Sequence, residues 1–283
     1  MTSRFSQALL LTLPVLLAGC ETDGTTTNQP QLPSGLFFGF YKEDRSNIDS
    51  NVEKIGSFYA GIPNTNDDLN MHMSFQYDPN CQAINLLTLK GIRSNQLVAT
   101  GSAKFDRAIV PDTSNSTTIS ITGDYTSNPQ LSSGGYYGGV YGRTDRQPSQ
   151  PNQQRGYDNL NCSGGYNISR QGVWFLFAEG TRHPANFDIN IQANTNQVLW
   201  SLPLLGDNKA AQHALISVYD RNQLRSNSTT EKALVHQIFV PATPAAARLP
   251  TDLDQSERDY VVTVQLFDSQ LNWGAIAQTN ARF

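Results

Sequence analysis

Charged side chains are scarce in this chain of 283 residues. They make up 16% of the sequence, whereas about a quarter is usual, and the formal net charge is −4. Lysine is especially sparse, so we expect no basic surface and no nucleic-acid partner. After the first twenty residues, no apolar run approaches the length of a transmembrane helix. Asn, Gln, Ser, Thr and Gly are abundant instead, as is common in exported β-rich proteins.

The common catalytic and metal-binding motifs are also missing. The sequence has no G-x-S-x-G, no S-x-x-K, no EF-hand loop and no glycine-rich loop between a strand and a helix. The four histidines show no metal-ligand spacing, and one strand would send His72 away from Met71 and Met73. Carboxylate pairs such as Asp67-Asp68 are typical of turns. We therefore expect no enzyme activity, no metal and no cofactor; a hydrolase with carboxylates on distant strands is the least favoured alternative.

Cysteine occurs three times. Cys20 follows Leu17-Ala18-Gly19 at the end of a short apolar run with Arg4 before it, which is the pattern of a secretory signal. A Cys directly after Leu-Ala-Gly resembles a bacterial lipobox. That resemblance implies cleavage before Cys20 and acylation of Cys20, and several acyl chains hold a protein on a membrane almost permanently. The alternative is an ordinary secretory signal with a chance Cys.

The compartment then follows from the neighbouring residue. In enterobacterial lipoproteins an Asp after the Cys favours the inner membrane, and here Glu21 implies the outer membrane, with the protein facing the periplasm. In that oxidising compartment we expect Cys81 and Cys162 to form a disulfide, with a metal pair or a reactive thiol as alternatives. Closing a loop of about 80 residues would contribute roughly 4–5 kcal/mol.

The remaining pattern predicts an all-β protein in two parts. Residues 69–77 alternate strictly between apolar and polar, the mark of a half-buried strand. Many short runs of this kind, separated by turn residues, favour an antiparallel barrel or sandwich. We expect a signal peptide over 1–19, a flexible tether over 20–34, an N-terminal β domain over 35–192 and a C-terminal β-sandwich over 193–283. Residues 134–141, rich in Gly and Tyr, are expected to form a strand with close backbone approach or a solvated hairpin tip.

The C-terminal part resembles a known family. The residues that carry the resemblance are Ala214–Asp220, Ala233–Gln237, Leu249–Leu253 and Tyr260–Asp268, in that order. They look like the strands and turns of small lipoproteins of the YscW/YbaY type, which include secretion-system pilotins. The resemblance covers about 80 residues and implies a transthyretin-like sandwich that binds an outer-membrane component such as a secretin subunit. The type VI secretion lipoproteins share this architecture and compete with that reading.

These observations predict a non-catalytic outer-membrane lipoprotein that binds and positions, or stabilises, an envelope partner. Phe267, Trp273 and Phe283 are candidates for a partner-binding patch, although aromatic residues in the last strands more often close a core. Two alternatives stay open. One is a lipocalin-like protein with a small ligand inside the N-terminal barrel, and the other is a surface-exposed adhesive lipoprotein that uses the Gly-Tyr segment.

Overall fold

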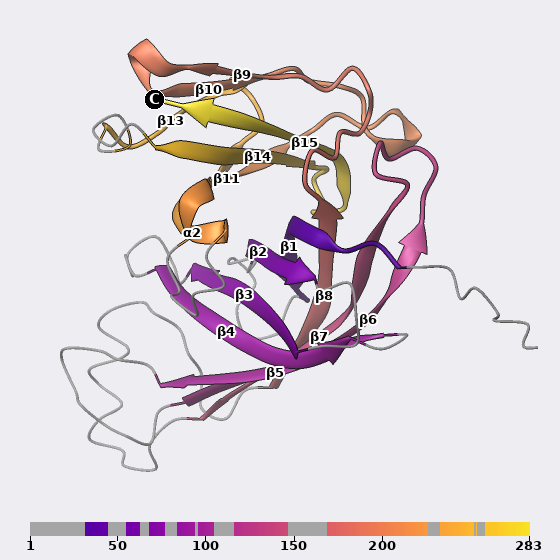
Figure 1. The fold of residues 1–283 in the computed structure, drawn as a ribbon. Helices are drawn as coiled ribbons and strands as arrows, with labels where there is room; N and C mark the ends of the chain where they lie inside the picture. Colours follow the sequence, from indigo (N-terminus) through magenta and orange to yellow (C-terminus); the bar gives the residue numbers. More distant parts are fainter. Residues whose placement is uncertain are drawn as a thin grey trace, which may run out of the picture. The chain divides into compact units, whose positions relative to one another are not determined.

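The protein is all-β, as the sequence predicts. The computed structural model describes residues 32–44, 55–62, 68–76, 84–93, 96–104, 116–146, 169–225, 233–251, 253 and 258–283. Eight antiparallel strands close into a barrel, in which each strand pairs with the next along the chain and the last returns to the first (Figure 1). These strands are β1 (Gly35–Glu43), β2 (Ile55–Ile62), β3 (Asp68–Gln76), β4 (Ile84–Arg93), β5 (Leu97–Lys104), β6 (Ser116–Ser127), β7 (Gly135–Arg146) and β8 (Ser169–Ala178).

Side chains fill the barrel interior. Because successive residues of a strand point to opposite faces, Phe37 and Tyr41 of β1 lie inside the barrel while Phe38 and Phe40 lie outside it. Rings make up much of the interior, and no side chain of this cluster is more than 3% exposed. The cluster contains Phe37, Tyr41, Phe58, Ala60, Ile62, Met71, Leu97, Ala99, Ile119, Ile121, Tyr137, Tyr141, Trp174 and Leu176. A barrel of eight strands is just wide enough for side chains to fill it.

The Gly-Tyr segment is strand β7, and its glycines allow the close backbone approach that the sequence predicts. Gly139 pairs with Gly123 of β6, and a Cβ on Gly139 would lie 2.1 Å from the carbonyl oxygen of Thr122. Tyr137 and Tyr141 point into the barrel and are at most 1% exposed. The two alternatives based on an exposed Gly-Tyr segment, a solvated hairpin tip and an adhesive surface, are therefore wrong for these tyrosines.

Two further antiparallel sheets follow the barrel in sequence. One has the order β13-β10-β9 and the other β12-β11-β14-β15. Their inward faces share one apolar core, which includes Val198 and Trp200 from the first sheet and Ile216, Val264 and Ala277 from the second, so the two sheets form a sandwich. The strands are β9 (Ile189–Gln192), β10 (Gln197–Trp200), β11 (His213–Asp220), β12 (Leu234–Pro241), β13 (Ala246–Arg248), β14 (Asp259–Phe267) and β15 (Trp273–Arg282).

The four-stranded sheet of the sandwich is buried on both faces. Its second face packs against the outer side of the barrel wall, where Phe267 of β14 meets the ring of Phe40 edge-on at 4.9 Å. Tyr219 of β11 packs on Phe38 of the same barrel strand, with the two rings tilted and their centroids 4.8 Å apart. Packing of this second face on the barrel explains why β14 carries apolar side chains on both of its faces. The strand lies inside a layered core and has no vacant face.

A buried polar seam runs through this barrel–sandwich contact. The hydroxyl groups of Ser57 on β2 and Ser217 on β11 share a hydrogen bond, and Ser57 N donates to Gln237 Oε1 at 2.8 Å. The Tyr219 hydroxyl faces the same serines, and burial raises the pKa of Tyr219. Gln265 on β14 is 1% exposed, and neither atom of its amide has a hydrogen-bond partner within the described part of the chain. These polar groups fix the register of the two parts while leaving one amide uncompensated.

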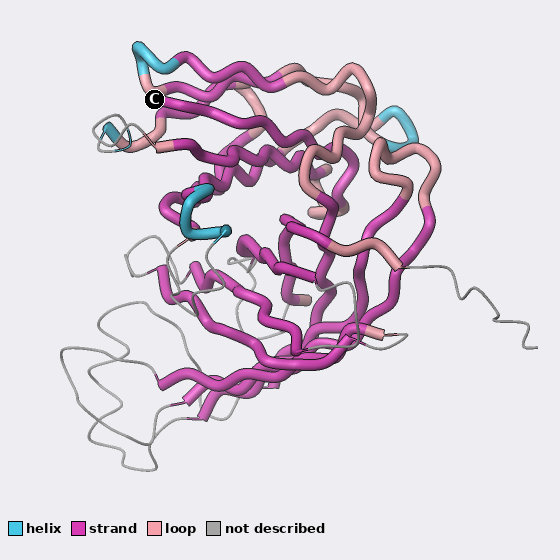
Figure 2. Tube along the Cα trace, viewed as in Figure 1, coloured by secondary structure: helices cyan, strands magenta, loops and turns pink. Residues whose placement is uncertain are grey.

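The two parts form a single compact unit over Leu32–Phe283. The boundary predicted at 192/193 falls inside a hairpin, because β9 and β10 pair across it, with Gln192 opposite Gln197. The barrel itself ends earlier, at Ala178. Within the described residues the helical elements are short: α2 (Arg221–Arg225), the 3-10 turns η1 (Ala193–Thr195) and η2 (Gly206–Asn208), and 3-10 conformation at Thr251 and Leu253; Figure 2 draws helix in cyan. None of the described helices is long and apolar enough to span a bilayer.

Candidate functional site at the barrel–sandwich junction

The sequence-predicted cysteine sites lie outside the described residues. Cys20, Cys81 and Cys162 all fall in segments that the structure does not describe. The lipid attachment at Cys20 and the Cys81–Cys162 disulfide therefore stay predictions.

The three aromatic residues proposed for partner binding do not form an exposed patch. Phe267 is fully buried against the barrel, so it serves the core and cannot contact a partner. Trp273 is half-buried, with its ring edge-on to Phe177 at 5.1 Å. Phe283 is half-buried in a different cluster, beside Tyr260 at 5.5 Å. Of the two readings of these residues, core closure is the correct one for Phe267, because β14 has a second buried face.

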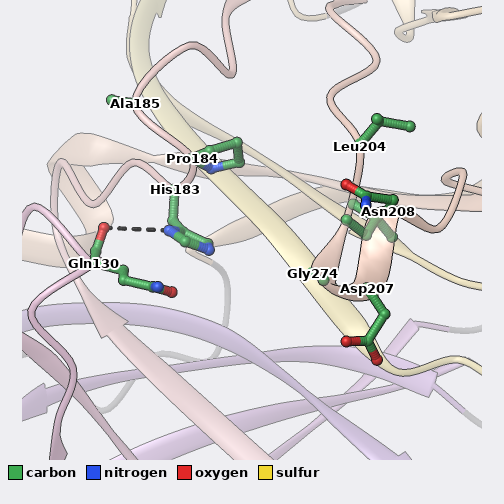
Figure 3. Close-up of a pocket in the computed structure, with 10 residues that line it drawn as sticks. Gln130, His183, Pro184, Ala185, Leu204, Asp207, Asn208 and Gly274 are labelled. Atoms are coloured by element: carbon green, nitrogen blue, oxygen red, sulfur yellow. Dashed lines mark hydrogen bonds between the residues drawn. The ribbon is translucent and has the colours of Figure 1, made fainter.

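A pocket of about 500 Å³ lies where the barrel and the sandwich meet. Three separate stretches of chain line it: the β6–β7 turn, the segment after β8, and the segment between β10 and β11, together with the start of β15. Figure 3 shows Gln130 and His183 on one side of the pocket and Leu204, Asp207 and Asn208 on the other, with Gly274 between them. This volume is within the range of small-ligand sites.

His183 is held firmly in the pocket wall. Its backbone forms a β-bridge with Ile276 of β15, with N–H···O distances of 2.7 and 2.8 Å. Its ring nitrogen Nδ1 lies 3.2 Å from the backbone oxygen of Gln130. Because a carbonyl oxygen only accepts hydrogen bonds, Nδ1 is the donor of this bond. Two elements of the fold thus orient the imidazole.

Asp207 and Asn208 form the opposite wall in an unusual backbone conformation. Both residues have left-handed φ angles, 59° and 57°, although neither is a glycine. Holding a residue other than glycine in this backbone region costs conformational free energy, and such residues are concentrated at functional sites. The two cations in the neighbouring segments pair with other carboxylates: Lys209 pairs with Asp268, and Arg182 pairs with Asp188. Neither of them forms an ion pair with the Asp207 carboxylate.

The lining combines polar groups with an apolar surface. Imidazole, carboxylate and amide groups come from His183, Asp207, Gln130 and Asn208, while Pro184, Leu204 and Leu205 provide apolar contact. Such a site suits a group with hydrogen-bond donors or a positive charge on an apolar stem, such as a basic side chain of a peptide segment. Among the described residues, no three His, Cys, Asp or Glu side chains are grouped so that they could hold a metal ion.

Sequence reasoning missed this site. From the sequence, His183 is only one of four histidines without metal-ligand spacing, and nothing there shows that β10 ends at Trp200, before Leu204. The available signal was Pro203, which has no N–H to donate and favours a strand end before it. Comparison of the chain with protein-family models, with curated proteins and with solved structures finds no match. The site therefore rests on its geometry.

Proposed function

We propose that this chain is a lipid-anchored protein of the bacterial outer membrane that binds and positions another envelope component without catalysing a reaction. The lipobox-like Leu17–Cys20 segment supports the anchor. The filled barrel interior is the main observation that supports the binding of a partner. Because aromatic side chains fill the barrel interior, a ligand or partner would bind on the outer surface of the protein. This favours partner binding over the lipocalin-like alternative, in which a small ligand lies inside the barrel.

The junction pocket is the part of that surface best suited to recognition. It is concave, it joins apolar and polar groups, and rigid β elements hold its walls. An extended partner segment would place an apolar side chain against Leu205 and Pro184 and a basic side chain at Asp207. A secretin subunit is the partner class that the YscW/YbaY-type resemblance implies, which makes the proposed role pilotin-like.

The proposal is tested by affinity purification of the lipidated protein after crosslinking in cells, with two variants beside the natural chain. Ala185→Trp fills the pocket from an exposed lining position. Thr100→Trp adds the same ring at an exposed position on β5, outside the pocket, and is the matched control. We expect one outer-membrane multimer to be recovered with the natural chain and with Thr100→Trp, and to be lost with Ala185→Trp. Equal recovery with all three proteins would exclude the pocket.

The anchor is tested separately. Mass spectrometry of the mature amino terminus is expected to show an acylated Cys20, and Cys20→Ser is expected to release the protein from the membrane. A mature chain that carries no acyl group at Cys20 would contradict the lipoprotein half of the proposal and leave the partner half standing.

A further inference from the structure

Two leucines beside the pocket are exposed to solvent. Leu202 is 47% exposed and Leu204 is 64% exposed, and both lie in the segment between β10 and η2. Leucine side chains gain roughly 1.5–3 kcal/mol each when they are buried. Two leucines this exposed in one short segment, with Pro203 between them, present apolar surface to solvent beside the pocket.

The chain enters the barrel at Pro33, beside Tyr137. The Tyr137 hydroxyl donates a hydrogen bond to the backbone oxygen of Pro33 at 2.7 Å. Tyr137 itself is buried in the barrel, where its ring meets Phe37 and Tyr125 edge-on at 5.3 and 5.1 Å. The position of Pro33 is therefore fixed at one end of the barrel.

The antiparallel topology places the pocket at that same end. β1 begins there at Gly35, and its neighbour β8 ends there at Ala178. β6 also ends and β7 begins at this end, so the β6–β7 turn and the segment after β8 both leave from it. Gln130 and His183, which face Leu204 across the pocket, come from these two connections. Figure 1 shows the start of β1 and the end of β6 on the same side of the barrel.

The chain between the predicted anchor and the barrel is short. Pro33 is the thirteenth residue after Cys20, and even a fully extended chain of this length spans only about 45 Å. That distance is similar to the diameter of a small domain. An anchor at Cys20 would hold the Pro33 end of the barrel nearer to the bilayer than the opposite end.

We propose that Leu202 and Leu204 insert into the surface of the bilayer in which Cys20 is anchored, and so turn the junction pocket towards membrane-proximal segments of the partner. This inference rests on the lipid anchor of the proposed function. The contact is apolar, because the nearby cations Arg182 and Lys209 are paired with carboxylates and Asp207 adds a negative charge. The surface therefore fits a zwitterionic bilayer, and the contact does not need anionic lipid.

The test uses the lipidated protein in vesicles of phosphatidylethanolamine and phosphatidylcholine, with and without brominated acyl chains that quench tryptophan. Leu204→Trp places a probe in the exposed segment. Val140→Trp is the matched control, because Val140 is 62% exposed but lies five residues into β7, about 17 Å from its start. The emission of the natural protein is subtracted, because the chain has three tryptophans of its own. We expect quenching and a shift to shorter wavelength for the indole at position 204 and neither for the indole at position 140.

Each other outcome overturns the inference, for a different reason. An unquenched indole at position 204 would show that the segment stays in water, and equal quenching at both positions would show that the protein does not present this end to the bilayer. Flotation of the natural protein with the vesicles checks the anchor itself, and a protein that stays behind would refute the anchor and the inference together. The vesicles contain no other protein, so failure to find a partner in cells does not affect the result.

Discussion

Acidification is expected to destabilise the protein through His72. This histidine lies on β3 with its ring stacked on Tyr59, at a centroid distance of 4.8 Å. Tyr59 in turn meets Tyr219 of the sandwich edge-on at 5.2 Å, so His72 is joined through one ring to the barrel–sandwich contact. Burial lowers the pKa of His72 from 6.5 to about 4. The folded protein therefore keeps this imidazole neutral at pH values at which the unfolded chain protonates it.

The sign and size of the effect follow from this difference. Because the folded state binds fewer protons than the unfolded state between pH 6.5 and 4, the free energy of unfolding falls as the pH falls through that window. Stability is unaffected by His72 above pH 6.5. The contribution of His72 amounts to a loss of about 2 kcal/mol at pH 5 and about 3 kcal/mol below pH 4.

The measurement is urea unfolding, followed by tryptophan fluorescence, at about pH 7.5 and about pH 5. His72→Phe keeps a ring on Tyr59 but removes the titrating group. We expect the natural protein to lose about 2 kcal/mol more than His72→Phe between the two pH values. If both proteins lose the same amount, His72 is not buried in the neutral form and the reasoning is refuted.

Three further predictions concern the core and a turn. Gly139→Ala should cost about 1–3 kcal/mol by thermal unfolding, because the added Cβ meets Thr122 O, whereas Gly61→Ala, with nothing within 4 Å of its added Cβ, should change stability by less than about 0.5 kcal/mol. Gln265→Leu should raise the free energy of unfolding by about 1 kcal/mol, because it removes a buried amide that lacks a partner among the described residues; a loss would show that the amide is satisfied. Asp268→Ala should lower the midpoint of thermal unfolding at pH 7, and this difference from the natural protein should shrink below pH 3.8. Burial raises the pKa of Asp268, but hydrogen bonds from Asn272, Gln270 and Lys209 outweigh burial and leave that pKa lowered. The natural protein therefore loses this stabilisation as the carboxylate is protonated. A deficit that stays constant with pH would contradict the role of the charge.

Much of the secondary structure could be predicted from the sequence because the strands alternate. The run over 69–77 alternates strictly, and β3 occupies Asp68–Gln76 with Met71 in the barrel interior. The Gly-Tyr segment was also recognisable as a strand with close backbone approach. Tyr137 and Tyr141 point inward, whereas Tyr136 packs outside the barrel with Phe175 and Trp273. Gly123, which pairs with Gly139, leaves room for the Trp174 ring, and this depends on the pairing of the two strands.

The candidate site could not be predicted, because it depends on tertiary contacts. His183 and Gln130 are 53 residues apart in sequence, and they meet only because two connections leave the same end of the barrel. Strand β15 is hard to predict from the sequence for a related reason. Its residues include Gly274, Gln278, Thr279 and Asn280, and pairing with β14 together with burial against the barrel outweighs their weak strand pattern.

The most direct test of the account is photo-crosslinking in living cells from single positions of the lipidated protein. A photoreactive residue is placed at Asn208, inside the junction pocket, or at Val140 on the barrel wall. The account predicts one crosslinked outer-membrane protein from position 208, absent from position 140 and abolished when Ala185→Trp fills the pocket. The same adduct from both positions, or an adduct at position 208 that survives Ala185→Trp, would contradict the claim that this pocket binds the envelope partner.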